Sequence, residues 1–284
     1  MVAGDRGQVL LLGGLAIAIV FLTAIPLSNS LVVSESASSS ETVDDIDRTE
    51  RREASVERGI RTVLAGVNTS NTTAVNESLR AFSTYYTNVS GHQGGVYVNA
   101  TVNVGQSEKS VDRNSLSKPG GGNWQNPLVT GASISAYNLT ITDINVPVNS
   151  AYTVRISNSS ETWELRVYEQ GGGPPATVKV DVRPPGATWT SVGGCDSDTP
   201  LDIDVAEGTC SGGGSFTTYS DDLQGPYTVS FPNSGQSTDG RFSFIGSGDF
   251  NDDVDTTVRN PAINLSFVGS DVSYERTILA NETS

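Results

Sequence analysis

The chain has 284 residues and a formal net charge of −15, with 32 acidic against 17 basic residues. Only three of the basic residues are lysines. An acidic, lysine-poor surface stays hydrated in concentrated salt, where charge repulsion is screened, so the composition predicts a halophilic protein. The acidic field repels nucleic acid and the sequence has no basic run, which excludes nucleic acid as a partner.

The N-terminal segment is the first predicted element. Residues 7–34 carry no charge, and residues 9–27 are almost entirely apolar. A helix needs about 20 mostly apolar residues to cross the hydrocarbon core, so we expect a single-pass transmembrane helix over 8–33, in contact with membrane lipid. We expect the positively charged Arg6 to stay on the cytoplasmic side of the cell membrane and the acidic remainder of the chain to be exported. This gives an N-in, C-out orientation.

A cleavable secretory signal and an uncleaved anchor are the simplest alternatives for this segment. A secretory signal has a basic start and an apolar core of about 7–15 residues. Here Asp5 offsets Arg6 and the apolar run is longer, so the signal peptide fits poorly. The uncleaved anchor fits both the length and the hydropathy of the segment.

Residues 34–67 predict an amphipathic extension of the same helix. Apolar residues such as Ile46, Ile60 and Leu64 recur near helical spacing. Acid-to-Arg pairs four residues apart, Glu57 with Arg61 among them, add a few tenths of a kcal/mol each. We therefore expect one long helix from about Gln8 to Ala65, kinked at Pro26.

The sequence Arg6-Gly7-Gln8-Val9-Leu10, followed by a long apolar helix, resembles the start of archaeal, and in particular haloarchaeal, type IV pilin-like proteins. The resemblance is confined to about the first 65 residues. It implies that residues 1–7 are a leader and that a prepilin peptidase cuts between Gly7 and Gln8. It also implies that the apolar helix packs with other pilin-like subunits. Leu12 stands where many bacterial pilins have a glutamate.

Residues 68–284 predict an extracellular β-rich domain. Short runs of alternating apolar and polar residues are separated by clusters of Gly, Pro and Asn. The predicted strands are 96–104, 133–142, 152–157, 162–168, 176–182, 227–231, 241–245, 263–268 and 272–279. The stretch 184–225 has little periodicity and is interpreted as a long loop. The predicted fold class is therefore α+β: a long N-terminal transmembrane and amphipathic helix, then an antiparallel β-sandwich-like domain.

Cys195 and Cys210 are the only cysteines of the chain. In an exported protein such a pair predicts one disulfide, which stabilises the fold by about 3 kcal/mol in the chain-entropy model. A zinc site would need two further soft ligands, and the chain contains only one histidine, His92, so thiolate metal binding is not expected. Trp163, inside a predicted strand, is expected in the core.

Asn-x-Ser/Thr sequons predict a glycoprotein, because nine are present where composition alone gives about four. The candidate acceptors are Asn68, Asn71, Asn76, Asn88, Asn99, Asn138, Asn158, Asn264 and Asn281.

Asp249, Asn251, Asp253 and Asp255 place oxygen atoms at alternating positions, as the first half of a calcium loop does. The second half does not match an EF-hand, since Val254 occupies the position of the invariant glycine. A weak Ca²⁺ site or, more simply, a solvated acidic turn is the expectation, and no other cofactor is predicted.

No nucleophile or acid–base pair stands out, so we expect a protein that is not an enzyme. Ser115 and Lys118 have the spacing of the penicillin-binding nucleophile motif, but its partner motifs do not follow. The sequence predicts a pilin-like cell-surface subunit that assembles into or with a type IV pilus-like filament. The alternative is a membrane-tethered adhesive or lectin-like binding module that does not polymerise.

Overall fold

The computed structural model describes residues 41–91, 96–118, 122–124, 126–171, 177–195, 200–234, 238–269 and 272–280. The chain divides into two compact units. Unit 2 is Asn103–Ala262, and unit 1 contains the described residues before and after it. The chain therefore leaves unit 1 within one strand, forms all of unit 2, and returns within another.

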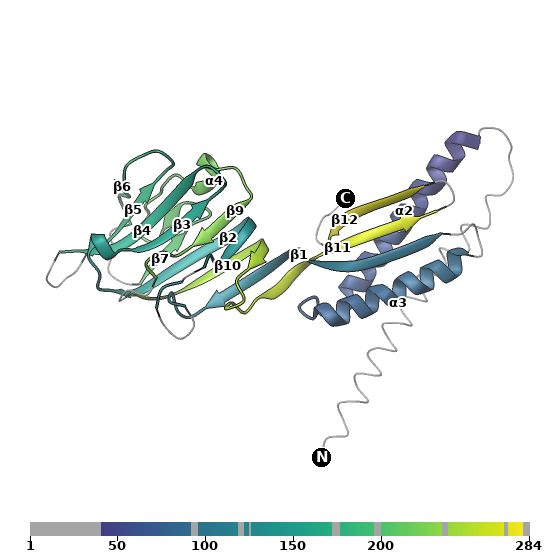
Figure 1. Ribbon diagram of the computed structural model, residues 1–284, viewed down its shortest axis with the longest axis horizontal. Coiled ribbons are helices and arrows are strands. Elements are labelled where there is room, and N and C mark those ends of the chain that lie inside the picture. The colour runs from purple at the N-terminus through teal and green to yellow at the C-terminus, as the bar shows by residue number, and fades with distance from the viewer. Residues whose placement is uncertain are drawn as a thin grey trace, which may run out of the picture. The chain divides into compact units, whose positions relative to one another are not determined.

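Unit 1 combines two helices with a three-stranded sheet in the order β12-β11-β1 (Figure 1). Its elements are α2 (Glu41–Ala65), α3 (Thr72–Gly91), the first part of β1 (Tyr97–Arg113), the last part of β11 (Thr257–Val268), and β12 (Ser273–Leu279).

Both helices bury one apolar stripe in the core of unit 1. On α2 the stripe contains Val56, Ile60 and Val63, and on α3 it contains Val75 and Leu79, all buried. Intervals of three and four residues place such side chains on one face of a helix. The sheet contributes every second residue of its strands, Val98, Ala100, Ile263, Leu265, Phe267 and Ile278.

Helix α3 covers the free edge of β1. In a strand at the edge of a sheet, backbone N–H groups lack a strand partner, and here polar side chains of α3 accept their hydrogen bonds. The pairs are Val102 N–H to Asn76 Oδ1 (2.9 Å), Ala100 N–H to Ser83 Oγ (3.2 Å) and Val98 N–H to Thr87 Oγ1 (3.2 Å).

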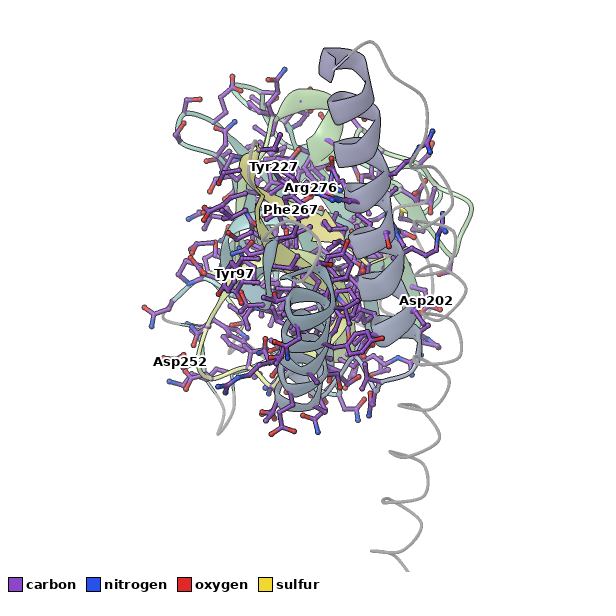
Figure 2. All side chains as sticks on the ribbon, turned by 90° about the vertical axis from the view of Figure 1, so that its right-hand side faces the viewer. Tyr97, Asp202, Tyr227, Asp252, Phe267 and Arg276 are labelled. Carbon is purple, nitrogen blue, oxygen red and sulfur yellow. A yellow bond between two sulfur atoms is a disulfide. The ribbon has the colours of Figure 1, made fainter. Side chains whose placement is uncertain are left out.

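Helix α2 is tied to the opposite edge strand by Arg276 of β12. The Arg276 guanidinium pairs with Glu53 at 2.9 Å and with Glu57, both on α2. Figure 2 shows Arg276 beside this helix. The Arg276 guanidinium carbon lies 5.8 Å from the centroid of the Tyr274 ring. The Phe267 ring stacks on that of Tyr274 with centroids 5.3 Å apart, so the ion pairs lie beside an aromatic part of the core.

Unit 2 is almost entirely antiparallel sheet. From the second part of β1 the strand order is β1-β10-β2-β9-β3-β4-β5-β6, and β7 pairs with both β2 and β8. One edge of β2 is shared, by β9 at Val129–Ala132 and by β7 at Asn138–Ile141. The remaining elements are β2 (Val129–Ile144), β3 (Tyr152–Ser157), β4 (Thr162–Gln170), β5 (Thr177–Arg183), β6 (Thr190–Ser191), β7 (Leu201–Asp204), β8 (Thr209–Cys210), α4 (Tyr219–Asp222), β9 (Tyr227–Ser230), β10 (Thr238–Phe250) and the short 3₁₀ turn Val148–Ser150.

The core of unit 2 is built around aromatic side chains from several strands of its sheet. Phe231, after β9, contacts Tyr137 of β2, Phe242 of β10 and Tyr152 of β3. Trp163 of β4 is fully buried, as the sequence predicts, and its indole N–H donates to the Thr217 carbonyl at 3.1 Å. Side chains of β2, β3, β4, β5, β9 and β10 therefore enter one core.

The fold class predicted from sequence is wrong. The described chain is mostly antiparallel sheet, and it contains no long apolar helix. It has two cores instead of one outer domain, and a second amphipathic helix, α3, occupies residues that the sequence analysis placed in the β-rich domain. The physical reason is that α3 buries Val75, Leu79 and Phe82 against the sheet of unit 1, which a single sandwich would leave uncovered.

The individual strands, in contrast, are confirmed. Each of the nine predicted runs overlaps an observed strand, and residues 152–157 match β3 at both ends. The stretch 184–225, interpreted from sequence as a loop, contains β6, β7, β8 and α4. These strands have two to four residues, too short for a period of two to emerge in the sequence.

Candidate binding face on unit 2

The outer face of β3, β4 and β5 carries a regular grid of charged and aromatic side chains. On each strand, core residues such as Val154, Leu165 and Val180 alternate with residues of the opposite face. Because partners across an antiparallel pair point to the same side, the strand register defines which of the outer residues are neighbours.

The first row of this grid is Arg155–Glu164–Arg183. Register places Glu164 opposite both arginines. Arg155 Nε donates to Glu164 Oε1 at 2.7 Å, and Arg183 Nη2 pairs with the other oxygen, Oε2. The Glu164 side chain is only 2% exposed, whereas those of Arg155 and Arg183 are 43% and 41% exposed. One buried carboxylate thus holds two guanidinium groups at the surface.

The second row contains Arg166 opposite Asp181. Arg166 donates to Asp181 Oδ2 through Nε at 2.9 Å and through Nη2 at 2.6 Å. The Tyr168 hydroxyl donates to the other oxygen, Oδ1, at 3.4 Å. Asp181 is 4% exposed. A second carboxylate, buried beneath the surface, therefore fixes the position of Arg166.

Trp189 lies at the end of the first row. The pairing of Val182 with Thr190 places Trp189 opposite Arg183, at the entrance to β6. The guanidinium carbons of Arg166 and Arg183 lie 4.1 and 4.7 Å from the centroid of the indole ring. Cation–π contacts of this kind contribute about 0.5–2 kcal/mol, and they hold the partly exposed ring against both rows.

We call this set of side chains the Trp189 face. It comprises Arg155, Glu164, Arg166, Tyr168, Lys179, Asp181, Arg183 and Trp189. Lys179 has an interaction of its own. The remaining charged groups are three arginines and two acids, a net charge of +1 in a protein of net charge −15. Chemically, the face offers oriented guanidinium donors beside aromatic rings, an arrangement that binds anions rather than cations.

The acidic residues proposed for calcium do not gather. Asn251 Oδ1 accepts from the Asp253 N–H at 2.9 Å, while its side-chain amide donates to the Pro127 carbonyl at 3.2 Å. Asp253 faces Lys118 at 3.8 Å, and Asp249 and Asp255 are exposed. Among the described residues no three His, Cys, Asp or Glu side chains form a group that could hold a metal ion.

Cys195 and Cys210 form the predicted disulfide, with Cα atoms 5.6 Å apart. Cys195 is fully buried and belongs to the core of unit 2. The bond joins the chain after β6 to strand β8, so it stabilises the segment of short strands instead of contributing a reactive thiol.

The sequons differ in how far their side chains are engaged. Asn158 Oδ1 accepts from the backbone N–H groups of Ser160 and Glu161, and its amide donates to the Gln224 carbonyl. Asn76 caps the edge of β1 and is half-buried. The exposed acceptors are Asn68, Asn71, Asn88, Asn99, Asn138 and Asn264. Asn281 lies outside the described residues.

The remaining predictions concern the N-terminus. Gly7, Gln8, the transmembrane segment 8–33 and the first residues of the amphipathic extension lie outside the described residues. Within the part of the chain that the structure describes, no helix is both long and apolar enough to cross a membrane.

The Trp189 face was not predicted from the sequence. The signal was present in residues 163–168 and 178–183, where arginines and acids alternate with apolar residues, but it predicted only a strand with one wet face. The pairing of Glu164 with two arginines depends on the register of β3, β4 and β5, which the sequence does not state.

Comparison of the chain with protein-family models, with curated proteins and with solved structures returns no match.

Proposed function

We propose that the protein is a non-enzymatic cell-surface protein in which unit 2 is a binding module and the Trp189 face is its binding surface. The N-terminal apolar segment holds it in the membrane. Unit 1 follows this segment along the chain and connects it to unit 2. The observation that carries the proposal is the Trp189 face itself.

Two properties of this face support a binding role. Trp, Tyr and Arg are the side chains most enriched at binding hot spots, and here they lie together in a chain whose 32 acidic residues outnumber its 17 basic ones. In addition, Glu164 and Asp181 orient Arg155, Arg166 and Arg183 before any ligand arrives. Donors that are already ordered lose less conformational entropy on binding.

The test is a binding screen with the full chain in detergent micelles, at molar salt. The panel contains neutral, carboxylated and sulfated polysaccharides together with acidic and neutral polypeptides. We expect binding to at least one class, and a loss of tenfold or more in Trp189→Ala. Arg241→Gln, a change at an exposed arginine of β10 away from this face, is the matched control. Absence of any binding, or equal binding by Trp189→Ala, refutes the proposal.

A pilin-like subunit is the second candidate function, and the residues Arg6–Leu10 favour it. In this case the chain is cut between Gly7 and Gln8, and the apolar segment packs with other pilin-like subunits in a filament. Mass spectrometry of the intact protein and of its N-terminal peptide, from native membranes, tests this. A mature chain starting at Gln8 supports it, a chain that keeps Met1 contradicts it, and a start beyond Ser30 contradicts membrane anchoring as well.

A further inference from the structure

We infer that the ligand of the Trp189 face is an acidic polysaccharide whose sugars carry carboxylate groups. The inference rests on the proposed binding function of this face and specifies its substrate class.

The charge of the Trp189 face indicates that its ligand is an anion. Apart from Lys179, the charged side chains of the face are three arginines and two acids, and both acids are buried beneath the arginines. A ligand therefore meets the guanidinium groups of Arg155 and Arg183, whose side chains are 43% and 41% exposed. A cationic ligand would be repelled, and a neutral one would have to displace water from these groups without a charge-assisted hydrogen bond in return.

Guanidinium geometry suits an oxyanion such as a carboxylate. Arg155 is bonded to Glu164 through Nε, which leaves its terminal amino groups for an external acceptor. A planar guanidinium matches a carboxylate, as it does a phosphate, with two parallel hydrogen bonds, which adds both energy and direction. In molar salt the Debye length is about 3 Å, so such short-range contacts, and not long-range attraction, must provide the recognition.

The aromatic rings favour a sugar over a polypeptide as carrier of the carboxylate. The only large apolar groups on the face are the rings of Trp189 and Tyr168, since the aliphatic side chains of β3, β4 and β5 point into the core. The centre of a protein interface is richer in apolar contacts than this. A sugar ring, with C–H groups on one face and hydroxyls at its edge, matches a partly exposed indole bordered by hydrogen-bond donors.

The row geometry suits a linear chain. Arg155, Glu164 and Arg183 follow one another across β3, β4 and β5, and Trp189 continues the row directly before β6. At about 4.8 Å per strand this row is about 14 Å long, and the pairing that defines it runs across strands β3 to β6 (Figure 1). A linear polymer can lie along such a row and present successive carboxylates and rings to it.

Titration of the full chain in detergent micelles with polygalacturonate fragments tests the inference. The matched probes are the methyl ester of the same polymer, which removes only the charge, and polyglutamate, which keeps the carboxylates without sugar rings. We expect polygalacturonate to bind at least tenfold more tightly than either probe. Arg183→Gln and Trp189→Ala should each weaken it tenfold or more, and Arg241→Gln should leave it unchanged.

The contrary outcomes separate the inference from the proposed function. Equal binding of the methyl ester means that the face recognises the sugar rings and not the carboxylate charge. Equal binding of polyglutamate means that it recognises the carboxylates and not the sugar rings. Either result overturns the inference and leaves unit 2 a binding module. If polygalacturonate does not bind while another member of the screening panel does, the inference also fails alone. If nothing binds, both fail.

Discussion

Ser83→Ala tests whether α3 stabilises unit 1 by covering the edge of β1. The Ser83 hydroxyl is buried and accepts the N–H of Ala100, which is itself 2% exposed. Removing the acceptor leaves a buried N–H without a partner, at a cost of about 1–3 kcal/mol. Alanine regains up to about 0.5 kcal/mol of helix propensity. The expected net loss of unfolding free energy is about 0.5–2.5 kcal/mol.

The two units can be followed separately in the same sample. All three tryptophans, Trp124, Trp163 and Trp189, belong to unit 2, whereas the long helices α2 and α3 belong to unit 1. Helical circular dichroism therefore reports the unfolding of unit 1, and tryptophan fluorescence reports that of unit 2. A loss of about 1 kcal/mol lowers the midpoint of a domain of this size by about 4–8 °C, so Ser83→Ala should lower the helical transition by several degrees.

Ser78→Ala is the matched control. Its hydroxyl donates to the Ala74 carbonyl one turn earlier in the same helix, at 2.9 Å, so its removal breaks no contact with the sheet and should change stability by less than about 0.5 kcal/mol. Amide exchange provides a second measurement, since the Ala100 N–H should exchange faster in Ser83→Ala than in the parent. The reasoning is refuted if Ser83→Ala and Ser78→Ala unfold alike, or if the tryptophan transition shifts as much as the helical one.

Three further predictions concern unit 2, followed by tryptophan fluorescence. Replacing Cys195 and Cys210 by serine should lower its stability by about 3 kcal/mol, and an unchanged midpoint would contradict this. Burial, with smaller contributions from Tyr227, Asp204 and Glu207, raises the pKa of Tyr219 to about 12. The neutral phenol is thus favoured in the folded state, and its contribution to stability is complete below about pH 10 and disappears as the pH rises through about 12. Tyr219→Phe should flatten this alkaline loss, and an identical pH profile would rule it out. Gly208→Ala should destabilise unit 2 by more than about 1 kcal/mol, because Gly208 has φ of +67° and a Cβ there would meet the Phe216 carbonyl oxygen; a wild-type midpoint would show that the turn relaxes.

The strands could be predicted because apolar and polar residues alternate in the sequence wherever one face of the sheet is exposed to solvent. Residues 96–104 alternate in the sequence, and in the structure Val98 and Ala100 are buried while Tyr97 and Asn99 are exposed. The division into two units could not be predicted from the same pattern. Strand β1 continues past Val102 into unit 2 without a turn, and alternation along a strand does not reveal that its side chains change from one core to another.

Helix α3 was not predicted from the sequence because its composition is unusual for a helix. Three sequons and several Thr and Ser residues lie between 71 and 91, and such residues favour caps and turns over helix interiors. The stripe Val75, Leu79, Phe82 and Tyr86 has helical spacing and was the signal that could have revealed it. Tertiary contact decides the outcome here, because the polar residues that weaken the isolated helix accept the hydrogen bonds of β1.

The order of the elements along the chain also determines when each unit can be completed. Unit 1 needs Ile263, Leu265 and Phe267 of β11 in its core, and these residues follow the whole of unit 2. During synthesis α2 and α3 therefore emerge long before the strand that completes their core, while unit 2 has all of its residues first. Domains usually fold as units during synthesis, so unit 2 can complete its core before unit 1, and the apolar stripes of α2 and α3 lack strand β11 of their sheet until then.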